Sequence, residues 1–253
     1  MATLGGRHAL VTGGSRGIGR AISAALANAG ATVTIVGRSE KTLAEATAAG
    51  HAAGYIVADV TDASMLAQGL ATAVAQRGPI DILVANAGGV ETTPFIKADA
   101  DHFRRMFELN VMSTVNAAHE VLPGMMSRGF GRIVAVSSTA GLKGYAYVSG
   151  YCAAKHAVVG FVRALALETA KSGVTVNAVC PGYTDTDLVR ESIDRVTAKT
   201  ARSREDALTA FLKDNPIGRL ITPEEVAGAV LFLCSPDAAA INGAALPVAG
   251  GEV

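Results

Sequence analysis

Short hydrophobic runs alternate with longer helix-forming stretches almost from one end of the chain to the other. The short runs are rich in β-branched residues and predict strands, whereas the stretches between them predict helices. We expect seven strands, at His8 to Thr12, Thr32 to Val36, Gly54 to Val57, Ile82 to Ala85, Arg132 to Ser137, Val174 to Val179 and Ala245 to Val248. We expect helices near 17–29, 40–49, 63–76, 99–126, 150–171 and 223–233.

This alternation is typical of repeated βαβ units, which build a parallel sheet covered by helices on both faces. We therefore predict an α/β fold with a Rossmann-type, doubly wound sheet of seven mainly parallel strands. No change in composition divides the chain, so residues 1–253 should form a single domain. One connection, at 183–215, is unusually long and helix-prone. It is either a lid over a substrate or an additional pair of surface helices.

Composition narrows the possible partners. Half of the residues are hydrophobic and 17% are charged, and Lys plus Arg (22) equals Asp plus Glu (22). No global field would attract nucleic acid or an acidic membrane surface. The apolar runs are shorter than a membrane span requires, and the N-terminal residues lack the features of a secretory signal. We expect a cytoplasmic protein.

Metal and disulfide chemistry is not indicated. The three cysteines are odd in number and far apart in the sequence, which does not suggest a disulfide framework. The five histidines, at positions 8, 51, 102, 119 and 156, are not paired at the spacing of metal ligands. We expect no catalytic metal.

A glycine-rich turn, Thr12-Gly13-Gly14-Ser15-Arg16-Gly17-Ile18-Gly19, connects the first strand to the first helix. Gly13, Gly17 and Gly19 would allow a sharp turn and the close approach of a pyrophosphate to the N-terminus of the helix. A tight turn without a ligand is the alternative. The position of the turn, at a strand-to-helix junction near the start of an α/β chain, favours a dinucleotide site.

The second strand ends in Gly37-Arg38-Ser39, where many NAD-binding folds carry an acidic residue that binds the ribose hydroxyls. Arg38, together with Arg16, could instead bind a 2′-phosphate. This pattern favours NADP(H), although NAD(H) stays possible. The alternative is that both arginines are solvated surface charges, with Arg38 paired to Glu40.

Three further polar positions follow along the chain. Asp59 and Val60 would either meet the adenine edge or cap a helix that starts near Ala63. Asn86-Ala87-Gly88 follows the fourth strand, where small residues would let a cofactor lie against the backbone, although Asn86 could simply form a turn. Asn110 lies in an otherwise apolar helical run. Its amide requires a partner, which could be a backbone carbonyl, a water molecule or both.

Tyr151 and Lys155 are four residues apart and would lie on one face of a helix. An adjacent cation favours the phenolate and would lower the pKa of Tyr151 toward neutral pH, where the phenol could exchange a proton. Taken alone, the pair is also compatible with an ordinary amphipathic helix.

These motifs together resemble those of short-chain dehydrogenases/reductases, and their order and spacing match across essentially the whole chain. The resemblance is carried by Thr12-Gly13-x-x-x-Gly17-x-Gly19, Asn86-Ala87-Gly88, Asn110, Ser138, Tyr151-x-x-x-Lys155, Pro181-Gly182, Asn215-Pro216-Ile217-Gly218-Arg219 and Thr222-Pro223-Glu224-Glu225-Val226. Agreement of so many ordered motifs favours the functional interpretation of Tyr151 and Lys155.

The resemblance implies a role for each catalytic residue. Tyr151 would donate a proton to the substrate oxygen during carbonyl reduction and accept it back during alcohol oxidation. Lys155 would lower the pKa of Tyr151 and bind the nicotinamide ribose. Ser138 would hydrogen-bond the same substrate oxygen, with Ser137 as the competing candidate, and Asn110 would hold a water molecule of the proton relay.

The resemblance also implies the cofactor site and the assembly. Pro181, Gly182, Thr184 and Thr186 would lie along the nicotinamide and its phosphates. The helices near 99–126 and 150–171 would form a homotetramer. The implied cofactor-binding residues are Gly13, Ser15, Arg16, Gly17, Ile18, Gly19, Arg38, Ser39, Asp59, Val60, Asn86, Ala87, Gly88, Tyr151, Lys155, Pro181, Gly182, Thr184 and Thr186.

Within the family the chain looks most similar to 3-oxoacyl-thioester (ACP or CoA) reductases, 3-hydroxyacyl-CoA dehydrogenases and polyketide ketoreductases. The finer resemblance is carried by Ser138-Thr139-Ala140-Gly141, Tyr151 to Gly160 and Asn177 to Gly182. We expect the substrate to be a 3-oxoacyl or 3-hydroxyacyl thioester. The alternatives are a non-thioester alcohol or a cyclic or aryl ketone, and a non-catalytic dinucleotide-binding regulator.

Other positions concern specificity rather than chemistry. Arg128 and Lys171 are candidate cations for docking a carrier protein near the mouth of the site, or simply helix C-terminal charges. Ala249 precedes Gly250-Gly251, where relatives often have an acidic residue. Specificity should come from the segments 89–98, 139–149 and 183–215.

Overall fold

The computed structural model describes residues 3–199, 203–212 and 215–253. Within these residues, seven strands form one sheet in the order β3-β2-β1-β4-β5-β6-β7, and every pairing is parallel. The strands are β1 His8–Thr12, β2 Thr32–Gly37, β3 Gly54–Val57, β4 Ile82–Ala85, β5 Gly131–Val136, β6 Val174–Pro181 and β7 Ala245–Val248. The predicted doubly wound sheet is confirmed, and every strand bound agrees to within two residues.

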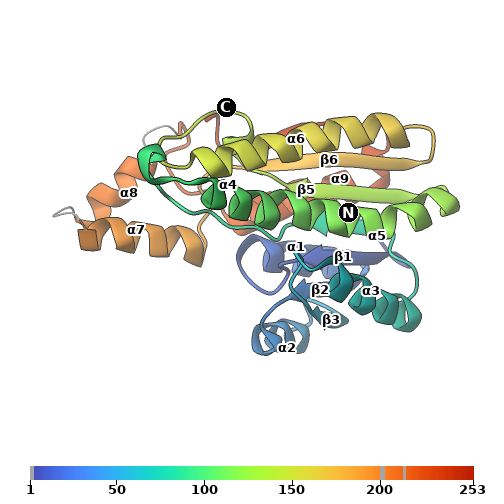
Figure 1. Ribbon diagram of the computed structural model, residues 1–253. Coiled ribbons are helices and arrows are strands. Elements are labelled where there is room, and N and C mark those ends of the chain that lie inside the picture. The colour runs from blue at the N-terminus through green and yellow to red at the C-terminus, as the bar shows by residue number, and fades with distance from the viewer. Residues whose placement is uncertain (1–2, 200–202, 213–214) are drawn as a thin grey trace.

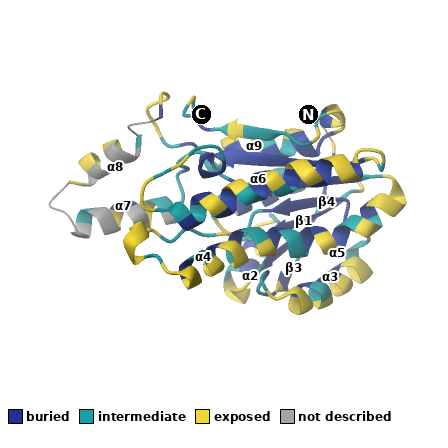
Figure 2. Cartoon of the chain, turned by 45° about the horizontal axis from the view of Figure 1, so that its top comes forward, coloured by how far each residue is buried: buried dark blue, intermediate teal, exposed yellow. Residues whose placement is uncertain are grey.

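Helices cover both faces of the sheet, as Figure 1 shows. One core contains Ile22 and Val226, from the helices that pack on one face, and a second core contains Leu66 and Val158, from those on the other. Figure 2 shows the strands buried between these two layers. The helices are α1 Gly17–Asn28, α2 Glu40–Ala48, α3 Ala63–Arg77, α4 Ala100–Phe107, α5 Ser113–Arg128, α6 Ser149–Thr169, α7 Asp187–Lys199, α8 Arg204–Leu212 and α9 Pro223–Cys234.

The helix predicted over 99–126 is interrupted, which corrects the sequence-based interpretation. Helix α4 ends at Phe107, a π-helical turn η2 occupies Glu108–Met112, and α5 begins at Ser113. The side chain of Asn110 donates through Nδ2 to the carbonyl of Met106, 3.0 Å away and four residues earlier. This amide occupies the acceptor that the backbone N–H of a regular α-helix would use, so the helix widens at Asn110.

The segment predicted as a lid contains the two helices α7 and α8, which extend beyond the sheet next to the start of α4 and α6 (Figure 1). Residues 200–202 and 213–214 of that segment lie outside the described residues. The helix pair is present, and closure over a substrate stays a prediction. No helix in the described part of the chain is long and apolar enough to cross a bilayer.

Candidate active site

Three elements bring the predicted catalytic residues together at the carboxyl end of the sheet. Ser138 follows β5, Tyr151 and Lys155 lie in the first turns of α6, and Asn110 lies in η2. The hydroxyl of Ser138 faces the phenol of Tyr151 and acts to lower its pKa. The ammonium of Lys155 lies 5.7 Å from the centre of the Tyr151 ring. The four-residue spacing thus places the phenol and the ammonium side by side, as predicted.

The phenol of Tyr151 is protonated at neutral pH. Burial raises its pKa to about 12, and Ser138 only partly opposes this effect. The expectation that Lys155 would lower the pKa of Tyr151 toward neutrality is therefore not met in this structure. Burial is the largest cause of this shift, and the ammonium of Lys155 donates to a backbone carbonyl instead of to the phenol. A phenol in this state suits protonation of a carbonyl oxygen.

Lys155 is a buried cation. The residue is 4% exposed, and burial lowers its pKa from 10.5 to about 8. Its Nζ donates to the carbonyl oxygen of Val136 at 2.9 Å. Among the described residues, no carboxylate forms an ion pair with it. A lysine with a pKa near 8 can gain and lose a proton close to neutral pH.

The two neighbouring serines have different surroundings. Ser138 Oγ accepts a hydrogen bond from the amide of Ala140 at 3.1 Å and so caps the short helix η3, Thr139–Gly141. Ser137 Oγ is buried and donates to the carbonyl of Lys155 at 3.1 Å. Ser138, rather than Ser137, therefore contacts Tyr151.

Asn110 holds the loop that follows β4. Its Oδ1 accepts from the amide of Gly89 at 3.2 Å, and its Nδ2 donates to the carbonyl of Gly89 at 2.9 Å. A Cβ atom on Gly88 would lie 2.7 Å from Asn110 Oδ1 and 3.5 Å from Lys155 Nζ. Gly88 therefore packs directly against the amide of Asn110, and a side chain at this position would clash with it. The water-holding role itself stays a prediction.

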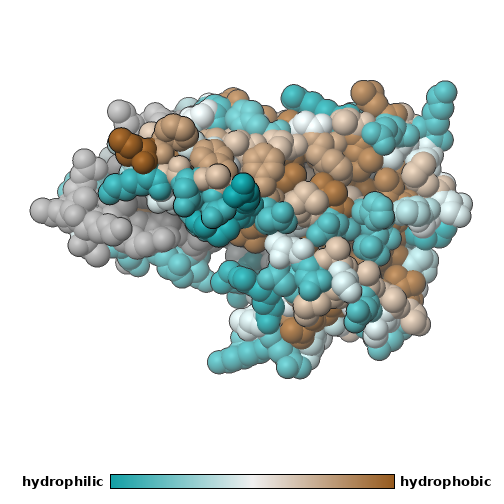
Figure 3. Space-filling model, in the orientation of Figure 1, coloured by the Kyte–Doolittle hydropathy of each residue, from teal (hydrophilic) through white to brown (hydrophobic). Residues whose placement is uncertain are grey.

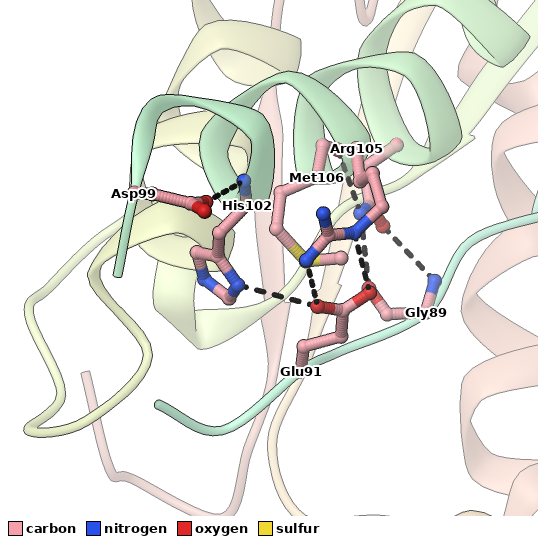
Figure 4. A network of polar contacts seen from close by, with 7 residues as sticks. Gly89, Glu91, Asp99, His102, Arg105 and Met106 are labelled. Carbon is pink, nitrogen blue, oxygen red and sulfur yellow. Dashed lines mark hydrogen bonds and ion pairs between the residues drawn. The ribbon is translucent and has the colours of Figure 1, made fainter. Parts of the chain in front are cut away.

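A second network, which sequence reasoning missed, holds the same loop from the other side (Figure 4). The carboxylate of Glu91 accepts hydrogen bonds from Arg105, at 3.1 Å, and faces His102 Nδ1 at 3.2 Å. The hydrogen bond from Arg105 holds the pKa of Glu91 below its usual range. His102 is buried against Gly150, the residue before Tyr151. No local spacing signals this network, because its partners meet only when the loop folds back onto α4.

The glycine-rich loop has the form that a dinucleotide requires. Gly13 and Gly17 have positive φ angles of 65° and 51°, which other residues rarely adopt. Helix α1 has no side-chain cap at its N-terminus. The loop residues present fit a bound pyrophosphate, which could accept hydrogen bonds from the first amides of this helix.

Asn86 shapes this loop. Its Nδ2 donates to the carbonyls of Thr12, at 3.0 Å, and Gly13, at 3.2 Å. The hydroxyl of Thr12 in turn accepts from the amides of Asn86 and Ala87, each at 3.0 Å. Asn86 is therefore more than a turn former, since it joins the end of β4 to the end of β1.

The two predicted arginines lie on segments that are tied together. Ser15 Oγ lies 3.1 Å from Thr42 Oγ1, and the amide of Thr42 donates to Ser39 Oγ at 3.4 Å. Ser15 precedes Arg16 and Ser39 follows Arg38, so this chain of hydroxyls brings the two segments side by side. Thr42 is a residue that sequence reasoning missed.

Arg38 pairs with Asp59 rather than with Glu40. Its Nη1 lies 4.0 Å from Asp59 Oδ2, and its side chain is 74% exposed. Asp59 does not cap a helix, because α3 is capped by Asp62, which accepts from the amide of Met65 at 3.0 Å. Asp59 accepts instead from the amide and hydroxyl of Thr61, which hold its pKa below the usual range. The helix-cap alternative is wrong.

The segment after β6 runs alongside the glycine-rich loop. The amide of Gly182 donates to the carbonyl of Val248 at 3.1 Å, and Thr184 Oγ1 donates to the carbonyl of Gly182 at 3.0 Å. A Cβ atom on Gly17 would meet the side chain of Thr186 at 3.3 Å. Thr186 therefore lies on the loop that would hold the pyrophosphate.

A cavity of about 530 Å³ opens between α7, α8 and Leu220. Its lining consists of Asp185, Arg190, Ile193, Glu205, Leu208 and Leu220. None of the four predicted catalytic residues is among them, so this hollow belongs to the helix pair and not to the reaction site.

Arg128 and Lys171 do not lie near the mouth of the site, which corrects the docking expectation. Arg128 ends α5, and its Nη2 donates to the carbonyl of Ile80 at 2.6 Å, just before β4. Lys171 lies in the turn that leads into the start of β6. Both residues are therefore at the amino ends of the strands, whereas Ser138 lies at the carboxyl end.

The described part of the chain contains no group of His, Cys, Asp and Glu residues placed to bind a metal ion. All three cysteines are free and buried.

Comparisons with known proteins give a consistent result. A sequence profile described as short chain dehydrogenase matches residues 7–196. The chain is 39% identical over 246 residues to an acetoacetyl-CoA reductase of Shinella zoogloeoides, covering 97% of this chain and 98% of that protein. It is 39% identical over 249 residues to a 3-oxoacyl-(acyl-carrier-protein) reductase of Vibrio harveyi, covering 98% of each. Among solved structures, a variant of actinorhodin polyketide ketoreductase with NADPH superposes with a TM-score of 0.93 at 36% identity, covering 100% of this chain and 99% of that one.

Proposed function

Because the chain belongs to the short chain dehydrogenase family and is an NAD(P)-dependent oxidoreductase acting on an alcohol or carbonyl group, we propose that it reduces a 3-oxoacyl thioester with NADPH. The observation that carries the proposal is the grouping of Ser138, Tyr151 and Lys155 at the carboxyl end of the sheet, where the phenol of Tyr151 is protonated at neutral pH and so has a proton to give.

The residues divide the reaction between them. NADPH, bound along the glycine-rich loop, would supply the hydride that the carbonyl carbon accepts. Tyr151 donates its proton to the carbonyl oxygen in the same step, so the ketone becomes an alcohol and Tyr151 a phenolate. Ser138, which faces the phenol of Tyr151, donates to the same oxygen and stabilises the charge that develops on it.

Lys155 and Asn110 return the proton to Tyr151. A lysine with a pKa of about 8 releases a proton readily, and the phenolate beside it is the stronger base. A water molecule would connect Lys155 to Asn110 and resupply the ammonium. The side chain of Asn110 would hold that water.

The preference for NADPH rests on charge at the end of β2. Arg16 and Arg38 lie on segments joined through Ser15, Thr42 and Ser39, and both arginines are exposed. A 2′-phosphate would accept charge-assisted hydrogen bonds from both guanidinium groups. The solved neighbour with NADPH supports the same cofactor.

A thioester substrate is supported by the relatives, since proteins 39% identical over nearly the whole chain are an acetoacetyl-CoA reductase and a 3-oxoacyl-(acyl-carrier-protein) reductase. The deciding experiment is a substrate panel containing acetoacetyl-CoA, a longer 3-oxoacyl thioester, and simple aryl and cyclic ketones, each with NADPH and with NADH. We expect the highest kcat/KM for a thioester with NADPH. A higher kcat/KM for a free ketone would contradict the thioester assignment and leave the reaction type intact.

We also propose a homotetramer. The outward face of the α5 and α6 layer carries apolar surface, which Figure 3 shows along these helices. It includes Leu167, 82% exposed, and Met126, 43% exposed. Such a face is stabilised when it packs on a symmetry mate. Light scattering coupled to size-exclusion chromatography would detect four copies.

A further inference from the structure

The penultimate residue of the chain carries a buried carboxylate. The side chain of Glu252 is 1% exposed, and its Oε1 lies 3.1 Å from the ammonium of Lys143. Lys143 also donates to the backbone carbonyl of Glu252 at 3.3 Å. A carboxylate held so deeply loses its hydration, so its burial is costly unless other groups compensate it.

A tyrosine connects this carboxylate to the segment that carries Ser138. The hydroxyl of Tyr145 donates to Glu252 Oε1 and lies 2.7 Å from the hydroxyl of Thr139. Since a carboxylate only accepts, Tyr145 gives it the single phenolic hydrogen and accepts from Thr139. Burial and the hydrogen bond to Glu252 raise the pKa of Tyr145 far above its usual value, so the donor is permanent. We call Lys143, Tyr145 and Glu252 the C-terminal cluster.

The same cluster contacts the start of the 183–215 segment. The ring of Tyr145 packs edge-on against the ring of Tyr183, with their centres 6.2 Å apart. The second carboxylate oxygen, Glu252 Oε2, lies 2.9 Å from where a Cβ on Gly182 would be. That oxygen is buried and has no hydrogen-bond partner among the described residues.

A buried oxygen without a donor is destabilising, so its position is set by other interactions. Three of these are visible: the ion pair with Lys143, the hydrogen bond from Tyr145 and the packing against Gly182. Together they join segments from residues 139–145, 182–183 and the C-terminus, which are far apart in the sequence. The first of these segments contains Thr139, the neighbour of Ser138.

We propose that Glu252 is a positioning residue, which fixes the segment after Ser138 against the carboxyl ends of β6 and β7 and so sets one wall of the substrate site. The proposal rests on the proposed function in one respect, namely that Ser138 and Tyr151 act on the substrate oxygen. Glu252 acts through Tyr145 and Thr139, and it does not touch the reacting atoms. The C-terminal residues are therefore part of the architecture of the active site.

The test removes the negative charge of Glu252 and retains the shape of its side chain. Glu252→Gln removes the ion pair with Lys143, and Glu252→Asp is the conservative variant that should restore part of the effect. Asp101→Asn is the matched control, since it removes a carboxylate from an exposed ion pair with Arg104 on α4. Tyr145→Phe, which removes only the hydroxyl, serves as the second variant if Glu252→Gln does not fold.

The first readout is hydrogen–deuterium exchange, which does not depend on turnover. The amides of Gly141, Leu142 and Lys143 are protected by hydrogen bonds to Ser138 and Thr139. We expect them to exchange at least about tenfold faster in Glu252→Gln, and at the wild-type rate in Asp101→Asn. Unchanged exchange in Glu252→Gln and Tyr145→Phe would overturn the proposal.

The second readout is catalysis. With acetoacetyl-CoA, kcat/KM should fall by about tenfold in Glu252→Gln, because a misplaced Ser138 loses its geometry toward the substrate oxygen. Faster exchange with wild-type kcat/KM would show a structural role only and overturn the positioning role. A wild type that reduces no ketone would instead contradict the proposed function, while the exchange rates still decide whether Glu252 fixes the segment.

Discussion

Two buried charges lie at the same end of the sheet and have opposite surroundings. Lys155 is 4% exposed and donates to the Val136 carbonyl, with no carboxylate paired to it among the described residues. Glu252, with a side chain 1% exposed, has an ammonium 3.1 Å away and a phenolic donor. Burial lowers the pKa of Lys155 to about 8. The contrast indicates that the charge for which we propose a chemical role has no counter-ion among the described residues, whereas the charge for which we propose a positioning role has one.

This difference has a physical reason. An ion pair with a carboxylate would hold the pKa of Lys155 high and would fix its proton. Left unpaired, the ammonium is destabilised by lost hydration, and it can release a proton to the phenolate that forms on Tyr151. The lost hydration of this ammonium lowers the stability of the fold, as is common at functional sites.

The largest effect is expected from Tyr151→Phe, because this variant removes the phenolic proton. In the proposed reaction, Lys155 returns that proton to Tyr151 after each turnover. We expect kcat for ketone reduction to fall by about 10²- to 10⁴-fold, the range found for general acids. NADPH binding, measured by fluorescence titration, should remain, since the ring is retained. Unchanged turnover in Tyr151→Phe would remove Tyr151 as the proton donor.

Lys155→Met removes the unpaired buried charge, so it should lower the activity and raise the stability of the fold. The drop in pKa from 10.5 to about 8 corresponds to roughly 3 kcal/mol of destabilisation of the folded state by the protonated ammonium. Loss of the donor to Val136 offsets part of the gain. We expect Tm at pH 7 to rise by a few degrees and kcat to fall by roughly 10²-fold.

The pH dependence supplies the control for Lys155→Met. Between pH 8 and 10.5 the unfolded wild type binds more protons at this lysine than the folded protein, so the lysine's penalty fades as the pH rises. The Tm advantage of Lys155→Met should be full below pH 8 and absent above about pH 10.5. An advantage that does not change with pH would mean that packing, and not charge, causes it.

The surroundings of Lys155 and those of Glu252 also differ in how far the sequence could predict them. The seven strands and the glycine-rich loop follow from local requirements: buried β-branched runs, and positive φ angles at Gly13 and Gly17. Tyr151 and Lys155 are four residues apart, so helical geometry alone brings them together. Their pKa values depend on burial by the whole fold, which is why the sequence-based expectation of a lowered pKa for Tyr151 did not hold.

The features that the sequence did not reveal have partners distant in the chain. Glu252 is more than a hundred residues from Lys143 and Tyr145, so no spacing signals their contact. The π-helical turn arises because one amide, on Asn110, displaces a backbone donor, a detail that hydrophobic periodicity does not contain. Network contacts of this kind become visible only when distant segments are placed in space.

Arg38 is an exposed charge, in contrast to the buried charges of Lys155 and Glu252. Its replacement should have the smallest effect on the stability of the protein. Arg38 is 74% exposed and 4.0 Å from Asp59, so its ion pair contributes little to stability. Arg38→Asp should therefore leave Tm nearly unchanged. It should lower the ratio of kcat/KM for NADPH to that for NADH by about tenfold or more, because a carboxylate repels the 2′-phosphate and can accept hydrogen bonds from ribose hydroxyls. Arg20→Asp, which changes another exposed arginine on α1, is the matched control. A wild type that already prefers NADH would contradict the two-arginine interpretation, since the charges would then have no phosphate to bind.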